Sequence, residues 1–306
     1  MKNLLSESQR IIRDEGVFSF TKKASIKIME RLLLPFILFA IYKFRKEVVK
    51  IRNLEEFVNF CYSFKIGRLT IAPLQIKEEI LELLKILQKF ELRNILEIGT
   101  ANGGTLFLFS QIAHPEAKII SIDLPAGKFG GGYPKWKIPV YKSFAKANQK
   151  IYLIRDDSHK LSTLQKVKSI LKNEKLDFLF IDGDHTYEGV KRDFYMYSKL
   201  VERESNSLTR YSLSYLRSRL SSRQILERDK KKIQRNYFFK KSNMGWDWNN
   251  FYLNGIIALH DIVPGPRENV GGVPRFWKEI KNFHKSREIV KDWNQRGYGI
   301  GIILFN

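Results

Sequence analysis

A glycine-rich turn between an apolar run and a helical pattern is the feature that most constrains how this chain can fold. The apolar run 95–98 ends in the turn 99–104, and helically spaced apolar residues follow at once from position 105 onward. This order predicts a strand, a tight turn and a helix. Glycines let the backbone approach a ligand closely, and the first turn of a helix offers unpaired N–H groups.

A second apolar run, 118–124, contains an acid near its end. Asp123 lies 24 residues after Gly99, close to the spacing of ~20 residues at which nucleotide-binding units place a ribose-binding carboxylate. The glycine spacing differs from G-x-G-x-x-G, and Glu97 stands two residues before the first glycine. Both features favour S-adenosylmethionine over a nicotinamide dinucleotide. An ordinary glycine turn without a ligand is the alternative.

The core alternates strand and helix patterns. We expect strands at 95–99, 119–124, 151–155, 177–182, 255–261, 287–293 and 299–305, and helices at 104–113, 139–148, 160–173, 187–201 and 274–284. Repeated strand–helix units predict an α/β fold with a mainly parallel, seven-stranded sheet and helices on both faces. Ligands bind at the carboxyl ends of such strands. The polar residues expected there are Asp123, Asp157, Asp182, His260 and Asp261.

The sequence divides into a basic amphipathic segment at 1–50, a helical lead-in at 51–92 and a main domain at 93–306 with an insertion at about 203–250. Residues 1–50 carry a net charge of +6 and residues 203–250 carry +8, out of +22 for the chain. Concentrated basicity suggests anionic partners, such as lipid headgroups, nucleic acid or a phosphorylated acceptor, although solvated charge without a partner explains it equally well. The single cysteine, Cys61, excludes a disulfide framework and suits a reducing cytoplasm.

The N-terminal segment does not have the pattern of a secretory signal. Its apolar run 32–42 has 11 residues, contains Pro35 and is flanked by Arg31 and Lys43. A spanning helix needs ~20 apolar residues, so the run predicts a helix lying in a membrane surface. Packing on the main domain or on a second subunit of a homo-oligomer is the alternative. The helical insertion is interpreted as a lid over the site, an arm that binds a partner or a partly ordered segment.

The lead-in predicts two helices with apolar stripes, one through Leu54 and Cys61 and one through Ile80 and Leu87. The segment 67–75 between them is expected to be a loop. Gln75 is either a polar contact at a cofactor site or, as the preferred interpretation, a residue that starts the second helix.

Three motifs together resemble class I S-adenosylmethionine-dependent methyltransferases, in the subgroup called cephalosporin-hydroxylase-like, which is related to metal-dependent O-methyltransferases. They are the segments 97–105, 182–187 and 259–262, and the resemblance covers roughly 70–202 and 251–306. It implies a Rossmann-like, doubly wound fold. It also implies methylation of a hydroxyl on a sugar, glycan, lipid-linked or secondary-metabolite acceptor.

The resemblance also implies residue roles. Glu97, Gly99, Thr100, Ala101 and Gly103 would frame the methionine part of the cofactor, Asp123 would bind ribose, and Asp157 and Ser158 would lie by the adenine. Asp182, His260 and Asp261 would hold a divalent cation, and His185 would be the general base. His260 stands where several metal-dependent relatives have an acid. This donor set favours Mn²⁺, or no metal, over Mg²⁺.

Methyl transfer requires a base that removes the acceptor's proton, and a neutral imidazole suits that task near pH 7. A structural hydrogen-bonding role is the alternative for His185. Asp184 is expected to cap the helix that starts near Thr186, and His114 and His159 are expected to be structural or exposed. A nucleic-acid-binding protein or RNA methyltransferase that uses the basic insertion is the alternative function. It is weakened because the sequence lacks the tetrapeptide and cysteine-pair motifs of base methylases.

Overall fold

The computed structural model describes residues 31–127, 129, 131–201 and 255–305. Most of the N-terminal segment and the whole of the insertion expected at 203–250 therefore lie outside the described residues. The alternative function, an RNA methyltransferase, depends on that insertion, so the described residues do not test it. Within the described part of the chain, no helix is both long enough and apolar enough to cross a membrane.

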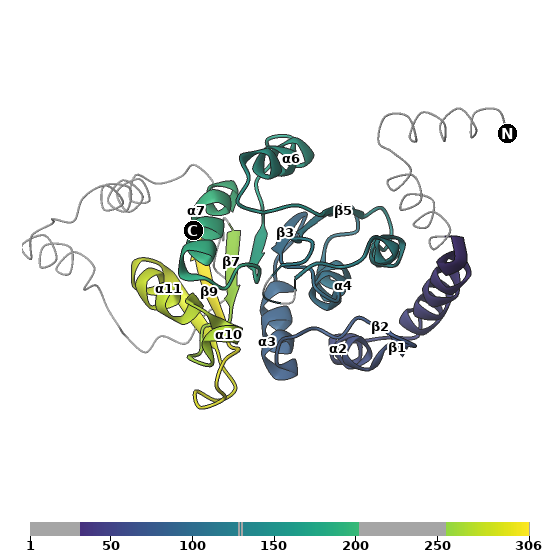
Figure 1. Cartoon of the computed structure of the whole chain (residues 1–306), viewed down its shortest axis with the longest axis horizontal. Coiled ribbons are helices and arrows are strands. Elements are labelled where there is room, and N and C mark those ends of the chain that lie inside the picture. The colour runs from purple at the N-terminus through teal and green to yellow at the C-terminus, as the bar shows by residue number, and fades with distance from the viewer. Residues whose placement is uncertain (1–30, 128, 130, 202–254, 306) are drawn as a thin grey trace, which may run out of the picture.

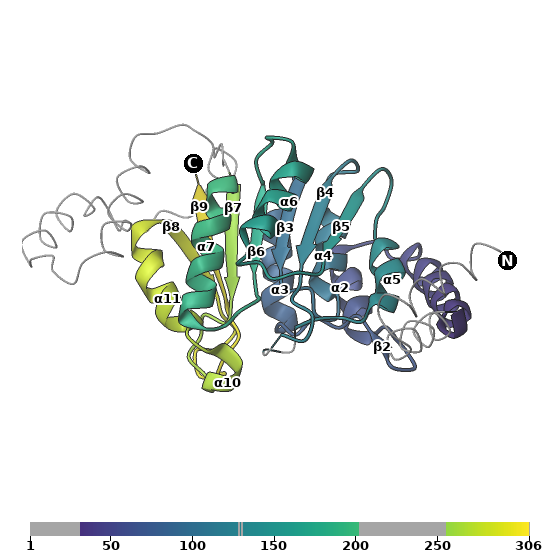
Figure 2. The same cartoon turned by 45° about the horizontal axis from the view of Figure 1, so that its top comes forward.

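A seven-stranded sheet forms the centre of the molecule (Figures 1 and 2). Its order is β5-β4-β3-β6-β7-β9-β8. All neighbours are parallel except β9, which is antiparallel to both β7 and β8. The strands are β3 (Asn94–Ile98), β4 (Lys118–Ile122), β5 (Lys150–Ile154), β6 (Phe178–Ile181), β7 (Gly255–His260), β8 (Lys285–Ile289) and β9 (Ile300–Phe305). This confirms the predicted fold class.

The helices cover both faces of the sheet. On one face lie a helix over 31–48, α2 (Leu54–Ser63), α3 (Lys77–Leu87), α4 (Gly104–Ile112) and α5 (Ile138–Lys142). On the other lie α6 (Leu161–Leu171), α7 (Tyr187–Val201) and α11 (Val273–Ile280). The short helix α10 (Arg267–Val270) precedes α11, and 3₁₀ turns occur at Lys135–Lys137 and Lys281–Phe283. The expected helix at 139–148 is thus shorter than predicted.

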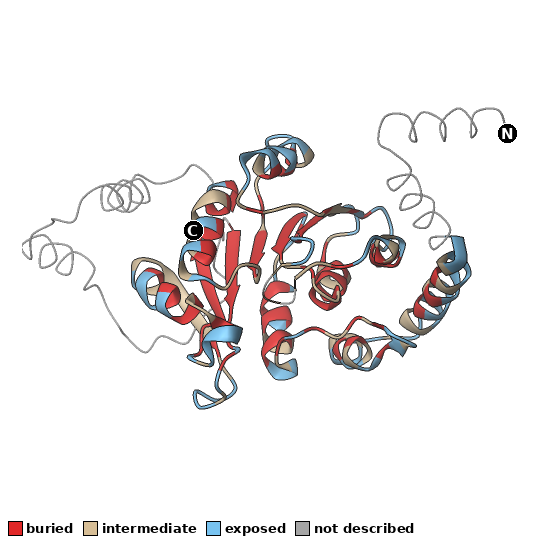
Figure 3. Cartoon of the chain, viewed as in Figure 1, coloured by how far each residue is buried: buried red, intermediate tan, exposed pale blue. Residues whose placement is uncertain are grey.

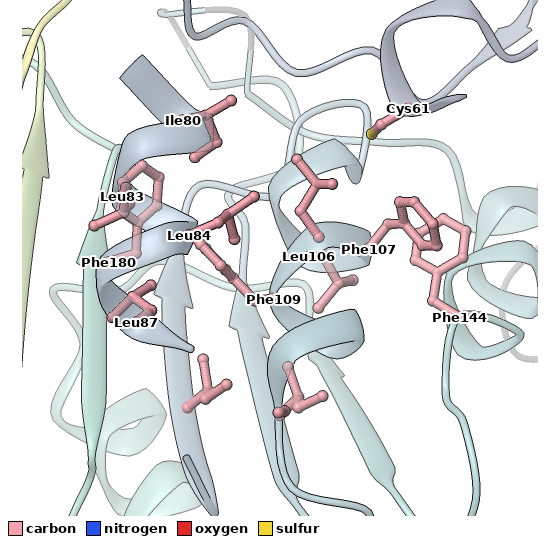
Figure 4. Packing of buried hydrophobic residues seen from close by; sticks show 14 of the residues in the cluster. Cys61, Ile80, Leu83, Leu84, Leu87, Leu106, Phe107, Phe109, Phe144 and Phe180 are labelled. Carbon is pink, nitrogen blue, oxygen red and sulfur yellow. The ribbon is translucent and has the colours of Figure 1, made fainter. Parts of the chain in front are cut away.

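Alternation along the buried strands explains the two layers. In β3, Ile95 packs with the layer of α3 and α4, whereas Leu96 packs with the layer of α6 and α7, because successive side chains of a strand point to opposite faces. Figure 4 shows the first layer, in which Phe109 of α4 contacts Phe180 of β6 with ring centroids 5.3 Å apart. Buried residues accordingly concentrate in the sheet and on the inward faces of the helices (Figure 3).

The lead-in differs from the prediction in one respect. The segment between α2 and α3 contains a small antiparallel pair, β1 (Lys65–Ile66) and β2 (Leu69–Thr70), where only a loop was expected. The apolar stripes of α2 and α3 are confirmed, because Cys61, Ile80 and Leu87 are fully buried. Burial also raises the pKa of the Cys61 thiol, as expected for a small buried apolar residue.

Candidate active site

The glycine turn between β3 and α4 is packed too closely for side chains. Gly99 has φ +99°, and a Cβ there would lie 2.0 Å from the carbonyl oxygen of Asp182. Gly103 has φ +81°, and its Cβ would lie 2.7 Å from the ring of Tyr141. Only glycine combines positive φ with such close contact at low cost. Because Gly103 supplies no side-chain cap to α4, the N–H groups of the first turn of α4 are not used by a capping side chain.

Asp123 ties this turn to the end of β4. Its Oδ2 accepts hydrogen bonds from the backbone N–H groups of Thr100 at 3.1 Å and Ala101 at 2.8 Å. Its Oδ1 accepts one from Gly132 N–H at 2.6 Å. Burial raises the pKa of Asp123, although these three donors oppose the shift. A ribose hydroxyl at this carboxylate would therefore have to share or replace the Gly132 contact.

Glu97 reaches the turn from inside the fold. It is fully buried, and its carboxyl group accepts hydrogen bonds from Ser121 Oγ at 2.6 Å and from Thr105 Oγ1. Burial raises the pKa of Glu97 to about 8, even though both hydroxyl donors lower it. In this structure, Glu97 holds β3, β4 and the start of α4 together, and its predicted contact with a cofactor stays a prediction.

Asp157 and Ser158 follow β5, the strand next to β4. Asp157 Oδ1 accepts from the N–H of His159 at 2.8 Å, which forms a local turn. Ser158 is buried, and its carbonyl accepts from the hydroxyl of Tyr197 at 2.7 Å. The sheet order places the ends of β5, β4, β3, β6 and β7 in one row. The candidate cofactor residues and the candidate cation residues therefore lie side by side along a single edge of the sheet.

Two aspartates and two histidines converge at the ends of β6 and β7. Asp182 Oδ1 lies 3.0 Å from His260 Nδ1 and 3.4 Å from His185 Nε2. Asp261 Oδ2 lies 3.3 Å from His185 Nδ1 and 3.5 Å from His260 Nδ1. Because β6 and β7 are adjacent and parallel, residues far apart in sequence meet here, as expected from the sequence.

The backbone at Asp261 adopts a left-handed conformation, which is uncommon for residues other than glycine. Its φ is +62°. The N–H of Tyr298 donates to Asp261 Oδ1 at 3.0 Å, which leaves Oδ2 beside the two imidazoles. Such strain persists where the surroundings hold it, and it clusters at functional sites.

The four charged groups shift one another's pKa values. Burial would raise the pKa of Asp182, but His260 and His185 outweigh it, so that the pKa lies well below its usual value. Burial would lower the pKa of His185, but Asp182 and Asp261 raise it to about 9. The pKa of His260 is likewise raised by both carboxylates against burial, whereas burial raises the pKa of Asp261.

His185 is therefore not the free imidazole that the sequence analysis expected. Its Nδ1 donates to the carbonyl of Asn269, its Nε2 faces Asp182, and its side chain is only 13% exposed. Phe129 stacks on the ring, with centroids 4.8 Å apart and planes inclined by 22°. The physical reason is the position of His185 between two carboxylates and a carbonyl, all of which accept hydrogen bonds.

Gln75 belongs to this cluster, contrary to the preferred interpretation of it as a helix-start residue. Its Nε2 donates to Asp182 Oδ2 at 2.6 Å, across 107 residues of sequence. The N-cap position of α3 is Ile76, without a side-chain cap. Asn269 of α10 and Phe129, which contact His185, were not identified from the sequence. A backbone carbonyl, which is what Asn269 contributes, and an isolated phenylalanine give no specific signal.

The start of α7 also corrects one prediction. Asp184 Oδ1 accepts from the N–H of Thr186 at 2.8 Å, and Thr186 Oγ1 accepts from the N–H of Gly189 at 3.0 Å. Because α7 begins at Tyr187, Thr186 is the capping residue and Asp184 stabilises the turn before it.

Two histidines and one cavity lie apart from this cluster. His159 Nε2 is 3.3 Å from the buried Asp193, and His114 Nε2 is 3.0 Å from Arg93, which fits their expected structural roles. A cavity of about 810 Å³ lies between α6 and α7. None of the candidate site residues lines it.

The residues present fit a divalent cation. In the described part of the chain, Asp182, His260 and Asp261 each offer a ligand atom, and these atoms all lie within 4.8 Å of one another. His260 Nε2 and Gln75 Oε1 are buried without a hydrogen-bond partner among the described residues. Two oxygens and one imidazole nitrogen suit Mn²⁺ better than Mg²⁺, which prefers oxygen ligands only.

Comparison with known proteins identifies the class. Residues 96–205 match the model of a family described as a methyltransferase domain. This stretch contains the glycine turn, Asp123, Asp182 and His185. The chain thus contains a methyltransferase domain, which confirms the predicted class of enzyme. A search of curated proteins found no match.

Among solved structures, the chain is similar to an O-methyltransferase from Bacillus cereus in complex with SAH. The identity is 16% and the TM-score 0.46, over 86% of this chain and 96% of the other. It is also similar to the O-methyltransferase TomG from Streptomyces achromogenes, involved in tomaymycin synthesis, in complex with SAM. Here the identity is 14% and the TM-score 0.43, over 84% of this chain and 91% of the other.

Proposed function

We propose that this protein transfers a methyl group from S-adenosylmethionine to a hydroxyl oxygen of a sugar, glycan, lipid-linked or secondary-metabolite acceptor. One observation carries the proposal. The glycine turn of β3 and the aspartate–histidine cluster of β6 and β7 meet where the strand order reverses, with Gly99 against the carbonyl of Asp182. In doubly wound sheets, ligands bind at this switch point. A methyl donor on the turn would therefore lie beside the cluster.

The residues around the turn fit a nucleoside cofactor. The uncapped first turn of α4 offers N–H donors to the carboxylate of the methionine part. Asp123, at the end of β4, offers carboxylate oxygens to ribose hydroxyls. Asp157 and Ser158 follow β5, the strand next to β4, on the side where the adenine would lie. The order of the three strands matches the order of the three parts of S-adenosylmethionine.

A cation, if bound, would be held by Asp182, Asp261 and His260. Such a cation lowers the pKa of a hydroxyl that it touches and orients it. Gln75 fixes the second oxygen of Asp182 at 2.6 Å, and Tyr298 N–H fixes the second oxygen of Asp261 at 3.0 Å. These contacts leave one oxygen of each aspartate directed at the shared point between the two strands.

His185 is proposed as the general base. The Asn269 carbonyl accepts from Nδ1, so this nitrogen keeps its proton and Nε2 is the atom that can take one. Stacking on Phe129 fixes the plane of the ring. Asp182 and Asp261 raise the pKa of His185 to about 9, which favours the protonated ring at pH 7. Before Nε2 can take the proton of the acceptor, His185 must therefore first lose its own.

The first prediction concerns the cofactor. We expect calorimetry to show that S-adenosylmethionine binds and that Asp123→Ala weakens the binding about tenfold or more, because a hydrogen bond to a charged group contributes about 1.5–3 kcal/mol. Glu116→Ala is the control. It removes a surface carboxylate that lies beside Arg93 at the opposite end of β4, and it should leave the affinity unchanged. Binding of a nicotinamide dinucleotide instead would refute the assignment.

A further inference from the structure

The helix over 31–48 has two apolar faces, of which one is buried in the protein. Its inward residues include Ile37, Ala40 and Phe44, which are 5%, 0% and 2% exposed. The ring of Phe44 lies 5.2 Å from that of Phe107 in α4 and 4.9 Å from that of Phe144. These contacts fix which side of the helix faces outward. The alternative that this run packs on the main domain is thus correct for one face.

The opposite face is apolar and exposed. The helix lies at the edge of the molecule (Figure 1), and its outer side is exposed (Figure 3). The exposed apolar residues of this helix are Leu32 at 71%, Leu34 at 51%, Leu38 at 58%, Phe39 at 49% and Tyr42 at 60%. Leu34, Leu38 and Tyr42 are each four residues apart, and Phe39 follows Leu32 by seven residues, so these residues lie on the side of the helix away from Ala40 and Phe44. Contiguous exposed apolar surface of this kind marks an interaction site.

Cations surround this outer apolar face. Arg31, Lys43, Arg45 and Lys46 are all exposed, and Lys46 Nζ lies 5.9 Å from the centre of the Tyr42 ring. The one acid between residues 31 and 50 is Glu47, which pairs with Lys50 at 3.2 Å. The outer face therefore combines large apolar side chains with positive charge that acidic residues do not cancel.

We propose that this outer face docks the protein on an anionic lipid bilayer, with the helix lying parallel to the surface. Apolar side chains would enter the headgroup region while the cations contact anionic headgroups. A second copy of the chain is a poorer occupant. A two-fold contact places the same patch of both subunits face to face, and these cations would then repel one another.

The docked orientation would be fixed by the fold. Phe36, on the same helix, packs edge-on against Trp136, with ring centroids 6.0 Å apart. Trp136 lies in the 3₁₀ turn Lys135–Lys137, which follows the loop that covers Asp123 through Gly132. The helix is thus attached to the region next to the candidate cofactor site, and docking would hold that edge of the sheet at a set distance from the membrane.

The test is cosedimentation of the full chain with vesicles of phosphatidylcholine, with or without phosphatidylglycerol. We expect binding to the vesicles that contain phosphatidylglycerol, and we expect it to weaken as salt rises. The double variant Leu38→Ser/Phe39→Ser should bind about tenfold more weakly or worse, because two apolar side chains no longer enter the bilayer. The matched control is Leu161→Ser/Trp293→Ser. It removes two apolar side chains that are 69% and 54% exposed on other parts of the surface, and it should bind as the unmodified chain does.

A second pair of variants tests the charges. Arg45→Glu/Lys46→Glu should abolish the preference for phosphatidylglycerol, whereas Lys278→Glu, at an exposed position of α11, should not. The proposal is overturned if the full chain ignores both kinds of vesicle, or if Leu38→Ser/Phe39→Ser binds unchanged. It is also overturned if sedimentation equilibrium shows a dimer that only this variant dissociates, because the face would then be an interface between copies.

Discussion

Replacing His185 by alanine is expected to lower kcat by about a hundredfold or more, as loss of a general base does, while S-adenosylmethionine binding stays intact. The reason is positional. His185 lies beside Asp182 and Asp261 with its Nδ1 fixed by the Asn269 carbonyl, whereas the glycine turn and Asp123 belong to other strand ends. The measurement is release of S-adenosylhomocysteine with a hydroxyl acceptor found by screening, together with calorimetry of cofactor binding.

His114→Ala serves as the control for this experiment. His114 pairs with Arg93 on the surface and should leave kcat unchanged. The conservative variant His185→Gln tests the role further. It retains a hydrogen-bond donor for Asn269 but no titratable nitrogen, so it should be as inactive as His185→Ala. If His185→Gln keeps full turnover, His185 acts by hydrogen bonding alone and the assignment as base is wrong.

Replacing Asp182 by alanine is expected to abolish turnover and to remove any response of activity to Mg²⁺ or Mn²⁺. Asp182 is the central acceptor of the cluster, because it contacts Gln75, His185 and His260 at once. Direct binding of Mn²⁺, measured by electron paramagnetic resonance, should weaken by more than about a hundredfold. Even the loss of a residue that only hydrogen-bonds to a metal ligand lowers metal affinity about 10–100-fold.

Asp184→Ala is the matched control, since it removes a carboxylate from the same loop. Among the described residues, Asp184 accepts a turn hydrogen bond from the N–H of Thr186, so we expect a stability loss of about 1 kcal/mol and unchanged Mn²⁺ binding. The isosteric variant Asp182→Asn separates loss of charge from loss of packing. The proposed cation site would be refuted if both Asp182 variants fold and still bind Mn²⁺ as tightly as the unmodified chain.

The sequence by itself determined the order of elements and the residues of the sheet edge. Apolar runs bounded by glycines and acids predicted the strands from β3 to β9 to within two residues at each end, except for β8, which ends four residues earlier than predicted. This succeeded because the strand period and the glycine turn are local properties of the chain. The rule that parallel strands end at one edge then predicted that Asp182 and Asp261 would converge, as they do.

Only the tertiary structure decided which side chains complete the cluster and how they are charged. Gln75 reaches Asp182 because α3 packs against the sheet, and no local pattern encodes that contact. The protonation of His185 likewise depends on two carboxylates that lie beside it only after folding. The buried face of the helix over 31–48 could not be predicted either, because its sequence is apolar on both sides. Burial of Phe44 in the core decided which face remains outside. Long-range packing sets these features, whereas periodicity reports only on neighbours along the chain.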